Sequence, residues 1–149
     1  MNIFKLIKKI FKPQSSYKVI SKSDLLDILC MQFAPSKPYI ALFDLNYICL
    51  SKIQAWSIWQ ELSMKFGTFK TGEYDCDDFA IQFTGEISRY SQRKDFAHTL
   101  CIGFCTTSKP AQHALNWFVD ENNKFYFLEP QNGAIFPASG DEVVDILLR

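Results

Sequence analysis

The sequence lacks an excess of charge of either sign, because its 16 Lys and Arg residues are matched by 16 Asp and Glu residues. A protein that coats nucleic acid needs a basic excess, so this balance argues against a nucleic-acid partner. No apolar run reaches the length that crosses a bilayer, and lysines interrupt the first apolar residues too often for a signal-peptide core. These absences predict a cytoplasmic protein.

The five cysteines lack the spacing of a zinc site, since there is no CxxC pair and no cysteine stands at zinc-finger distance from a histidine. An odd count leaves at least one thiol free, which favours a reducing compartment. Four cysteines lie in apolar stretches and are expected in the core: Cys30, Cys49, Cys101 and Cys105. Cys76 differs, because its neighbours are polar.

The chain has enough apolar residues to bury one core, with 149 residues of which 48% are hydrophobic and 15% aromatic. Residues 1–13 predict a basic amphipathic helix, in which the isoleucines and phenylalanines share one face and the lysines the other. Such a helix docks on the domain, or contacts a membrane surface or a partner through residues 2–12. Residues 14–149 are expected to form a single domain.

Hydrophobic periodicity predicts helices before strands along this domain. Helices are expected at 23–31, at 51–66 and from Cys76 onward, an extended segment at 39–50, strands at 99–105, 112–119 and 124–129, and a short helix from Asp141. The helix at Cys76 has Asp75 as its N-cap. Its inward face carries Cys76, Phe79, Ala80, Phe83, Ile87 and Tyr90. Helices followed by a small antiparallel sheet give an α+β domain.

Three residues have the chemistry of a nucleophilic thiol site, which needs an ionised thiol, a base and a group that orients the base. Cys76 begins a predicted helix, whose dipole stabilises a thiolate. His113 begins a predicted strand and Glu129 ends the next one. A three-residue hairpin loop places His113 opposite Glu129, whereas a four-residue loop places the two on opposite faces. Taken singly, each residue also fits a purely structural role.

The acidic residues beside Cys76 oppose this reading, because the negative charge of Asp75, Asp77 and Asp78 disfavours a thiolate. Either these carboxylates point away or a cation neutralises them, and hard carboxylate oxygens make Ca²⁺ the first candidate. An oxyanion would be bound by the backbone N–H of Cys76 and by a side-chain amide, for which Gln60 and Gln54 are candidates.

Three short motifs resemble a known family: residues 74–80 (YDCDDFA), 112–117 (QHALNW) and 128–133 (LEPQNG). They are similar to the papain-like cysteine-protease domain at the C-terminus of the Marasmius oreades agglutinin and its relatives. The resemblance covers residues 74–133 and implies a papain-like fold, with Cys76, His113 and Glu129 as catalytic triad. It also implies calcium-dependent activity, with Asp77 or Asp78 in contact with the ion. The lectin part of that family has no counterpart here.

The function predicted from these observations is a cysteine hydrolase of the peptidase type, which cleaves an amide bond in a protein or peptide substrate. Two alternatives remain open from the sequence. One is a catalytically inactive papain-like binding module or an inhibitor of a host protein, which the aromatic composition and the basic N-terminus permit. The other is a transglutaminase-like acyl transferase, which uses the same Cys–His chemistry with an amine as acceptor.

Overall fold

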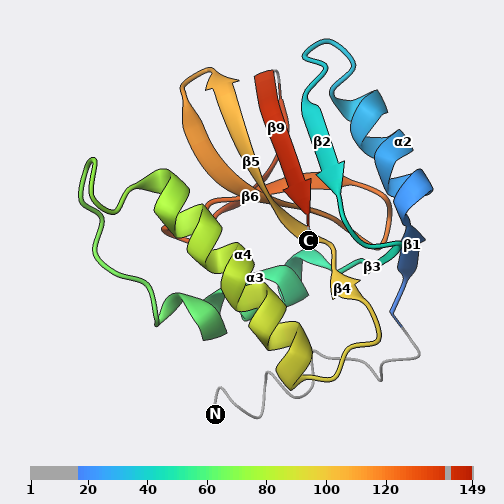
Figure 1. Ribbon diagram of the computed structural model, residues 1–149, viewed down its shortest axis with the longest axis horizontal. Coiled ribbons are helices and arrows are strands. Elements are labelled where there is room, and N and C mark those ends of the chain that lie inside the picture. Colours follow the sequence, from blue (N-terminus) through green and yellow to red (C-terminus); the bar gives the residue numbers. More distant parts are fainter. Residues whose placement is uncertain (1–16, 140–141, 149) are drawn as a thin grey trace.

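The computed structural model describes residues 17–139 and 142–148, which form two sheets and three helices (Figure 1). The three-stranded sheet has the order β1-β3-β4, with β1 (Val19–Ser21), β3 (Asn46–Ile48) and β4 (Thr99–Leu100). The six-stranded sheet has the order β2-β9-β5-β6-β7-β8, with β2 (Tyr39–Leu42), β5 (Ile102–Lys109), β6 (His113–Val119), β7 (Phe125–Leu128), β8 (Ile135–Pro137) and β9 (Glu142–Leu148). The helices are α2 (Lys22–Gln32), α3 (Lys52–Ser63) and α4 (Cys76–Arg93). Within the described ranges, no helix has the length and apolar character that a membrane span needs.

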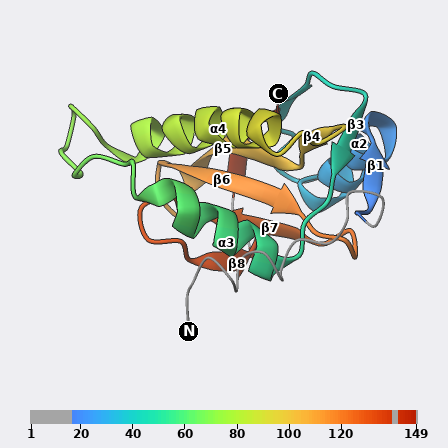
Figure 2. The ribbon, with the colours of Figure 1, turned by 90° about the horizontal axis from the view of Figure 1, so that it is seen from below.

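The six-stranded sheet buries both of its faces, as the alternation along β6 makes clear. Leu115, Trp117 and Val119 belong to a cluster that includes Leu25 and Leu29 of α2. Phe118 belongs to a second cluster, to which α3 and α4 contribute Ile58, Leu62, Phe83, Ile87 and Tyr90. Figure 2 shows α4 lying along β5 and β6, with α3 beside it.

Helix α4 forms where its sequence predicts it, from Cys76 with Asp75 as N-cap. The carboxylate of Asp78 accepts a hydrogen bond from the backbone N–H of Asp75 (3.3 Å) and so satisfies one donor at the helix start. The predicted inward face is buried at Phe79, Ala80, Phe83, Ile87 and Tyr90. One polar residue joins them, because Glu86 is buried in ion pairs with Lys65 and Arg89.

The predicted order of helices followed by a small antiparallel sheet is wrong. Strands β1, β2 and β3 precede α3, and the larger sheet is mixed, because β2 and β9 pair in parallel. In this pair Tyr39 faces Asp145 and Leu42 faces Leu148. Strands β2 and β9 are separated by about a hundred residues, and such distant pairing leaves no pattern in the neighbouring sequence. Hydrophobic periodicity therefore predicts only an extended segment at β2.

The short helix expected from Asp141 is also wrong, because Glu142–Leu148 form strand β9. This strand has three buried residues, Val143, Ile146 and Leu148. Three positions are too few to distinguish the period of a helix from that of a strand. Residues 1–13, predicted as an amphipathic helix that contacts a membrane or partner, lie outside the described residues.

Candidate thiol site

Cys76, His113 and Glu129 lie together, although they come from a helix, a strand and a turn. His113 is the first residue of β6, and its Nε2 atom lies 2.7 Å from Oε2 of Glu129, one residue after β7. Cys76 is the first residue of α4, and its side chain hydrogen-bonds to the same imidazole ring. Because Glu129 occupies Nε2, the nitrogen left for the thiol is Nδ1.

The hairpin register explains the contact between His113 and Glu129. Strands β6 and β7 pair Asn116 with Leu128 and Val119 with Phe125, which leaves a loop of five residues, Asp120 to Lys124. The loop is longer than the predicted three residues, but its odd length keeps His113 and Glu129 on one face. They are diagonal neighbours in this register, and the length of the Glu side chain closes the gap.

The turn after β7 fixes the carboxylate of Glu129. The backbone N–H of Gln131 donates to Glu129 Oε1 (3.1 Å), and Trp59 on α3 donates its indole N–H to the carbonyl of Pro130 (2.8 Å). Gly133 closes the turn with a φ of 75°, and a Cβ there would overlap the Trp59 ring. No local sequence pattern points to Trp59, because its contact with this turn joins residues 71 positions apart.

Electrostatics at the site favour a protonated imidazole. The hydrogen bond from Glu129 raises the pKa of His113 to about 9; burial opposes this shift, and the contact with Cys76 adds to it. The ring is therefore an imidazolium near neutral pH and stands between a thiol and a carboxylate. His98, the second histidine, lines a different cleft with Asp44 and Asp95.

Cys76 and His113 line an open cleft of about 730 Å³, which is walled by β5, β6, β9 and the start of α4. Its lining residues are Asp75, Cys76, Asp77, Thr106, Thr107, Ser108, Gln112, His113, Ala114, Val144 and Asp145. Gln60, the predicted oxyanion donor, is not among them, and Gln54 is used in the capping box of α3. The side-chain amide in this cleft is that of Gln112, which precedes His113 directly.

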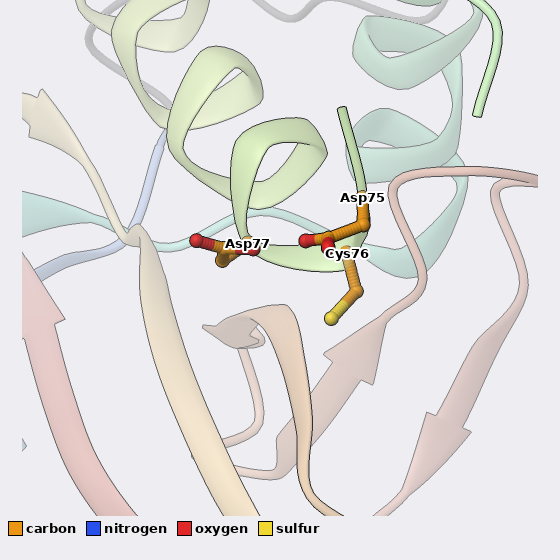
Figure 3. A group of neighbouring side chains, drawn as sticks. All are labelled: Asp75, Cys76 and Asp77. Carbon is orange, nitrogen blue, oxygen red and sulfur yellow. The ribbon is translucent and has the colours of Figure 1, made fainter. Parts of the chain in front are cut away.

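Two of the three aspartates form a carboxyl pair over the helix start. Figure 3 shows the Cys76 sulfur directed toward the strands, with Asp75 and Asp77 on the helix turn above it. The side chains of Asp75 and Asp77 share a hydrogen bond, which raises the pKa of Asp77 and lowers that of Asp75. Ligand atoms of Asp75, Cys76 and Asp77 lie within 4.8 Å of one another. Of the expected calcium contacts, Asp77 thus belongs to this group, whereas Asp78 caps the helix.

The other cysteines differ in exposure. Cys49, Cys101 and Cys105 are buried, as predicted for core residues. Cys30 is exposed, so its assignment to the core is wrong. It follows Leu29 on α2 and therefore points about 100° away from the buried stripe of that helix. Cys76 is half-buried, and none of the five cysteines forms a disulfide.

The chain belongs to the agglutinin C-terminal family, whose model matches residues 47–135, more than half of the chain. This range begins in β3, ends in β8 and contains the whole thiol site. The part of the resemblance that concerned agglutinin relatives is thereby confirmed.

Two solved structures share this fold. One is a complex of PSL1a with E64, with 26% identity over 87% of this chain and a TM-score of 0.75. The other is Polyporus squamosus lectin bound to the human-type influenza-binding epitope Neu5Acα2-6Galβ1-4GlcNAc, with 28% identity over 87% of this chain and a TM-score of 0.75. The chain spans 51% and 49% of their respective lengths. Among curated proteins, none matches this chain.

These findings contradict the prediction of a papain-like cysteine peptidase and of a hydrolase in general. The family is described as an agglutinin domain, and the chain matches about half the length of a lectin structure, so the papain-like fold class is corrected with it. The expected protein or peptide substrate is corrected too, because the epitope bound by the neighbour is an oligosaccharide. The error has a physical reason: a local side-chain arrangement can occur in folds and proteins of different function.

Proposed function

We propose that this chain is a module of an agglutinin-type carbohydrate-binding protein, and that its own working site is the thiol of Cys76. The observation that supports the thiol site is the Nε2–Oε2 distance of 2.7 Å between His113 and Glu129, next to Cys76. In this proposal Cys76 is the nucleophile, His113 exchanges its proton and Glu129 orients the ring.

The proposed chemistry is covalent capture of an electrophile, which an epoxide illustrates. Cys76 reacts as a thiolate whose proton His113 carries: its sulfur forms a bond to one epoxide carbon, and the bond from that carbon to oxygen breaks. His113, protonated near neutral pH by its raised pKa, gives a proton to the oxygen that leaves. Glu129 stabilises the imidazolium before this transfer and holds the ring in place. The half-buried position of Cys76 in an open cleft gives the reagent access.

Mass mapping after limited reaction with iodoacetamide or the epoxide E64 tests this proposal. Trypsin separates the thiols, because Cys76 lies on residues 71–89 and exposed Cys30 on residues 23–52. We expect label on Cys76 at least tenfold ahead of Cys30, and its loss in Cys76→Ser. Labelling of Cys30 with Cys76 untouched would contradict the proposal.

Carbohydrate binding is proposed for the protein as a whole, and the glycan epitope bound by the neighbour supports it. Within this chain the best place for a sugar is a pocket of about 360 Å³ lined by Trp59, Ser63, Phe66, Gly67, Phe69, Phe79 and Gln131. Aromatic rings stack on the apolar faces of pyranoses, and the Gln131 amide and Ser63 hydroxyl are available to bind sugar hydroxyls.

Titration with the trisaccharide Neu5Acα2-6Galβ1-4GlcNAc, followed by tryptophan fluorescence and calorimetry, tests the sugar pocket. We expect binding that is weakened at least tenfold by Phe69→Ala and unchanged by Phe43→Ala. Phe43 is the control because it is also exposed but lies outside the pocket. Absence of binding in the unmodified chain would remove this pocket from the proposal and leave the thiol site unaffected.

Two further parts of the proposal concern a bound calcium ion and the cellular compartment. A calcium ion held by Asp75 and Asp77 would neutralise the carboxyl pair beside Cys76, and hard carboxylate oxygens suit this ion. A reducing, cytoplasmic compartment would keep the cysteines out of disulfides, and none of the five forms one in the structure. Both are tested by the response of Cys76 labelling to calcium and to oxidants.

A further inference from the structure

A pair of buried thiols lies outside the thiol site, at Cys49 and Cys101. Strands β3 and β4 pair in parallel, with Tyr47 facing Thr99 and Ile48 facing Leu100. Each cysteine directly follows its strand, so the same register places Cys49 opposite Cys101. The backbone N–H of Cys101 donates to the carbonyl of Ile48 (2.8 Å), which continues the ladder to this pair.

The geometry of this pair suits a covalent link. Facing residues of adjacent strands have Cα atoms about 4.8 Å apart, and disulfides span Cα distances of about 4.4–6.8 Å. The two side chains already touch, because the thiols share a hydrogen bond. Both are buried, with 1% and 0% of their surface exposed, so no solvent separates the sulfur atoms.

From this juxtaposition of Cys49 and Cys101 we infer a redox modification site, at which a peroxide oxidises the two thiols to an intramolecular disulfide. The reaction is independent of Cys76 and of the proposed function. A peroxide is the fitting oxidant class, because hydrogen peroxide is small enough to enter a buried site during local opening.

The two thiols have different roles in this reaction. The hydrogen bond from Cys101 lowers the pKa of Cys49, and the charge of Lys18 adds to that effect, whereas burial raises the pKa of Cys101. The Cys49 thiolate attacks one peroxide oxygen, the O–O bond breaks, and hydroxide leaves with Cys49 as a sulfenic acid. The Cys101 thiol then attacks that sulfur, the S–O bond breaks and water is released. In sum, two thiols and one peroxide give one disulfide and two waters.

Peptide mapping after native treatment with hydrogen peroxide tests the inference. Trypsin leaves Cys30 with Cys49 on residues 23–52, and Cys101 with Cys105 on residues 95–124. The experiment therefore uses the Cys30→Ser, Cys105→Ser double variant, in which a link between these two peptides identifies Cys49–Cys101. We expect this link, its loss in a further Cys101→Ser change, and its reversal by dithiothreitol.

A stability measurement keeps the test independent of peptide recovery. The link should raise the midpoint of thermal unfolding by about 5 °C or more in the double variant, and dithiothreitol should reverse the rise. Free Cys49 and Cys101 after a peroxide dose that oxidises exposed Cys30 in the unmodified protein would overturn the inference. So would a link that forms only under denaturing conditions. Neither result depends on whether Cys76 reacts.

Discussion

At the scale of the residue, the site depends on His113, whose ring contacts both other members. Its raised pKa of about 9 comes first from Glu129, so the charge on the ring is a consequence of the turn after β7. The same ring lines the cleft of Cys76, whereas His98 lies in another cleft. Two single-residue predictions follow from this division of roles.

Replacing the ring should slow the reaction of Cys76 with iodoacetamide. His113→Asn removes the imidazolium that stabilises a thiolate, so the rate near neutral pH should fall at least tenfold. The matched control is His98→Asn, which should leave the rate within twofold. Mass mapping gives Cys30 as an internal standard in every sample. A larger loss in His98→Asn than in His113→Asn would reverse the assignment of the base.

Replacing Glu129, the acceptor of the His113 hydrogen bond, should change how the free energy of unfolding depends on pH. The folded-state pKa of His113 lies above the ordinary 6.5, so its contribution to stability is complete below pH 6.5 and is lost as pH rises through about 9. With screening by solvent at this partly exposed ring, the loss is on the order of 2 kcal/mol. Urea unfolding from pH 6 to 10 should show this decline in the unmodified protein.

The Glu129→Gln variant should show a much flatter profile, because the amide no longer favours the protonated ring. Glu73→Gln serves as the control, since Glu73 forms only an exposed pair with Lys70. That variant should keep the decline. If Glu129→Gln keeps it as well, the raised pKa of His113 has another cause than Glu129.

At the scale of the element, two local structures hold the site: the start of α4 and the turn after β7. The three aspartates at the start of α4 have different contacts. The carboxylate of Asp78 accepts the backbone N–H of Asp75, whereas the side chains of Asp75 and Asp77 hydrogen-bond to each other. In the turn, Trp59 on α3 fixes Pro130, and Gly133 allows a bend that a side chain would block. Each element gives one prediction.

Calcium should accelerate the labelling of Cys76 if the pair of Asp75 and Asp77 holds the ion. We expect a rate several-fold higher in calcium than in chelator, and no difference between the two in Asp77→Asn. Asp78→Asn is the contrast, because it should keep the calcium response and cost about 1 kcal/mol of stability through the weakened cap. Equal rates in calcium and in chelator would remove the ion from the site.

Substitutions that loosen the turn after β7 should lower the reactivity of Cys76, although they leave Cys76, His113 and Glu129 themselves unchanged. Trp59→Phe keeps an aromatic ring but loses the hydrogen bond to Pro130, which should cost about 1 kcal/mol. Gly133→Ala should cost more, about 2–4 kcal/mol, because it adds strain at a positive φ to a clash with Trp59. Gly72→Ala separates the causes, since that glycine has a positive φ but open space around it.

At the scale of the whole molecule, the site exists only because two layers meet. Cys76 belongs to the helix layer, while His113 lies in the sheet and Glu129 in the turn directly after β7. The buried amide of Asn116 joins the layers: it donates to the carbonyls of Ala80 on α4 and Gly103 on β5, each at 3.0 Å. Its partner Ala80 lies one helical turn past Cys76, and Asn116 itself lies three residues past His113.

Replacing Asn116 should therefore lower both the stability of the fold and the reactivity of Cys76. Asn116→Ala leaves two buried carbonyls without this donor and should lower the free energy of unfolding by about 2–3 kcal/mol. It should also slow Cys76 labelling more than Asn122→Ala, the control at an exposed loop position. Unfolding curves and labelling rates on the same samples check both effects. Unchanged labelling would mean that the layers are aligned by packing alone.

The sequence alone determined the local parts of this protein. The helix at Cys76, its cap and its buried face follow from neighbouring residues. The sequence left the hairpin loop open between three and four residues, and the structure has five, an odd length that puts His113 and Glu129 on one face. Tertiary structure decided the rest: the pairing of β2 with β9, the clamp of Trp59 on the Glu129 turn, and the exposure of Cys30. Each of these joins residues that are distant in sequence or depends on which side of an element is covered. Helix periodicity and capping are encoded within a few neighbouring residues, whereas such contacts arise only when the layers pack.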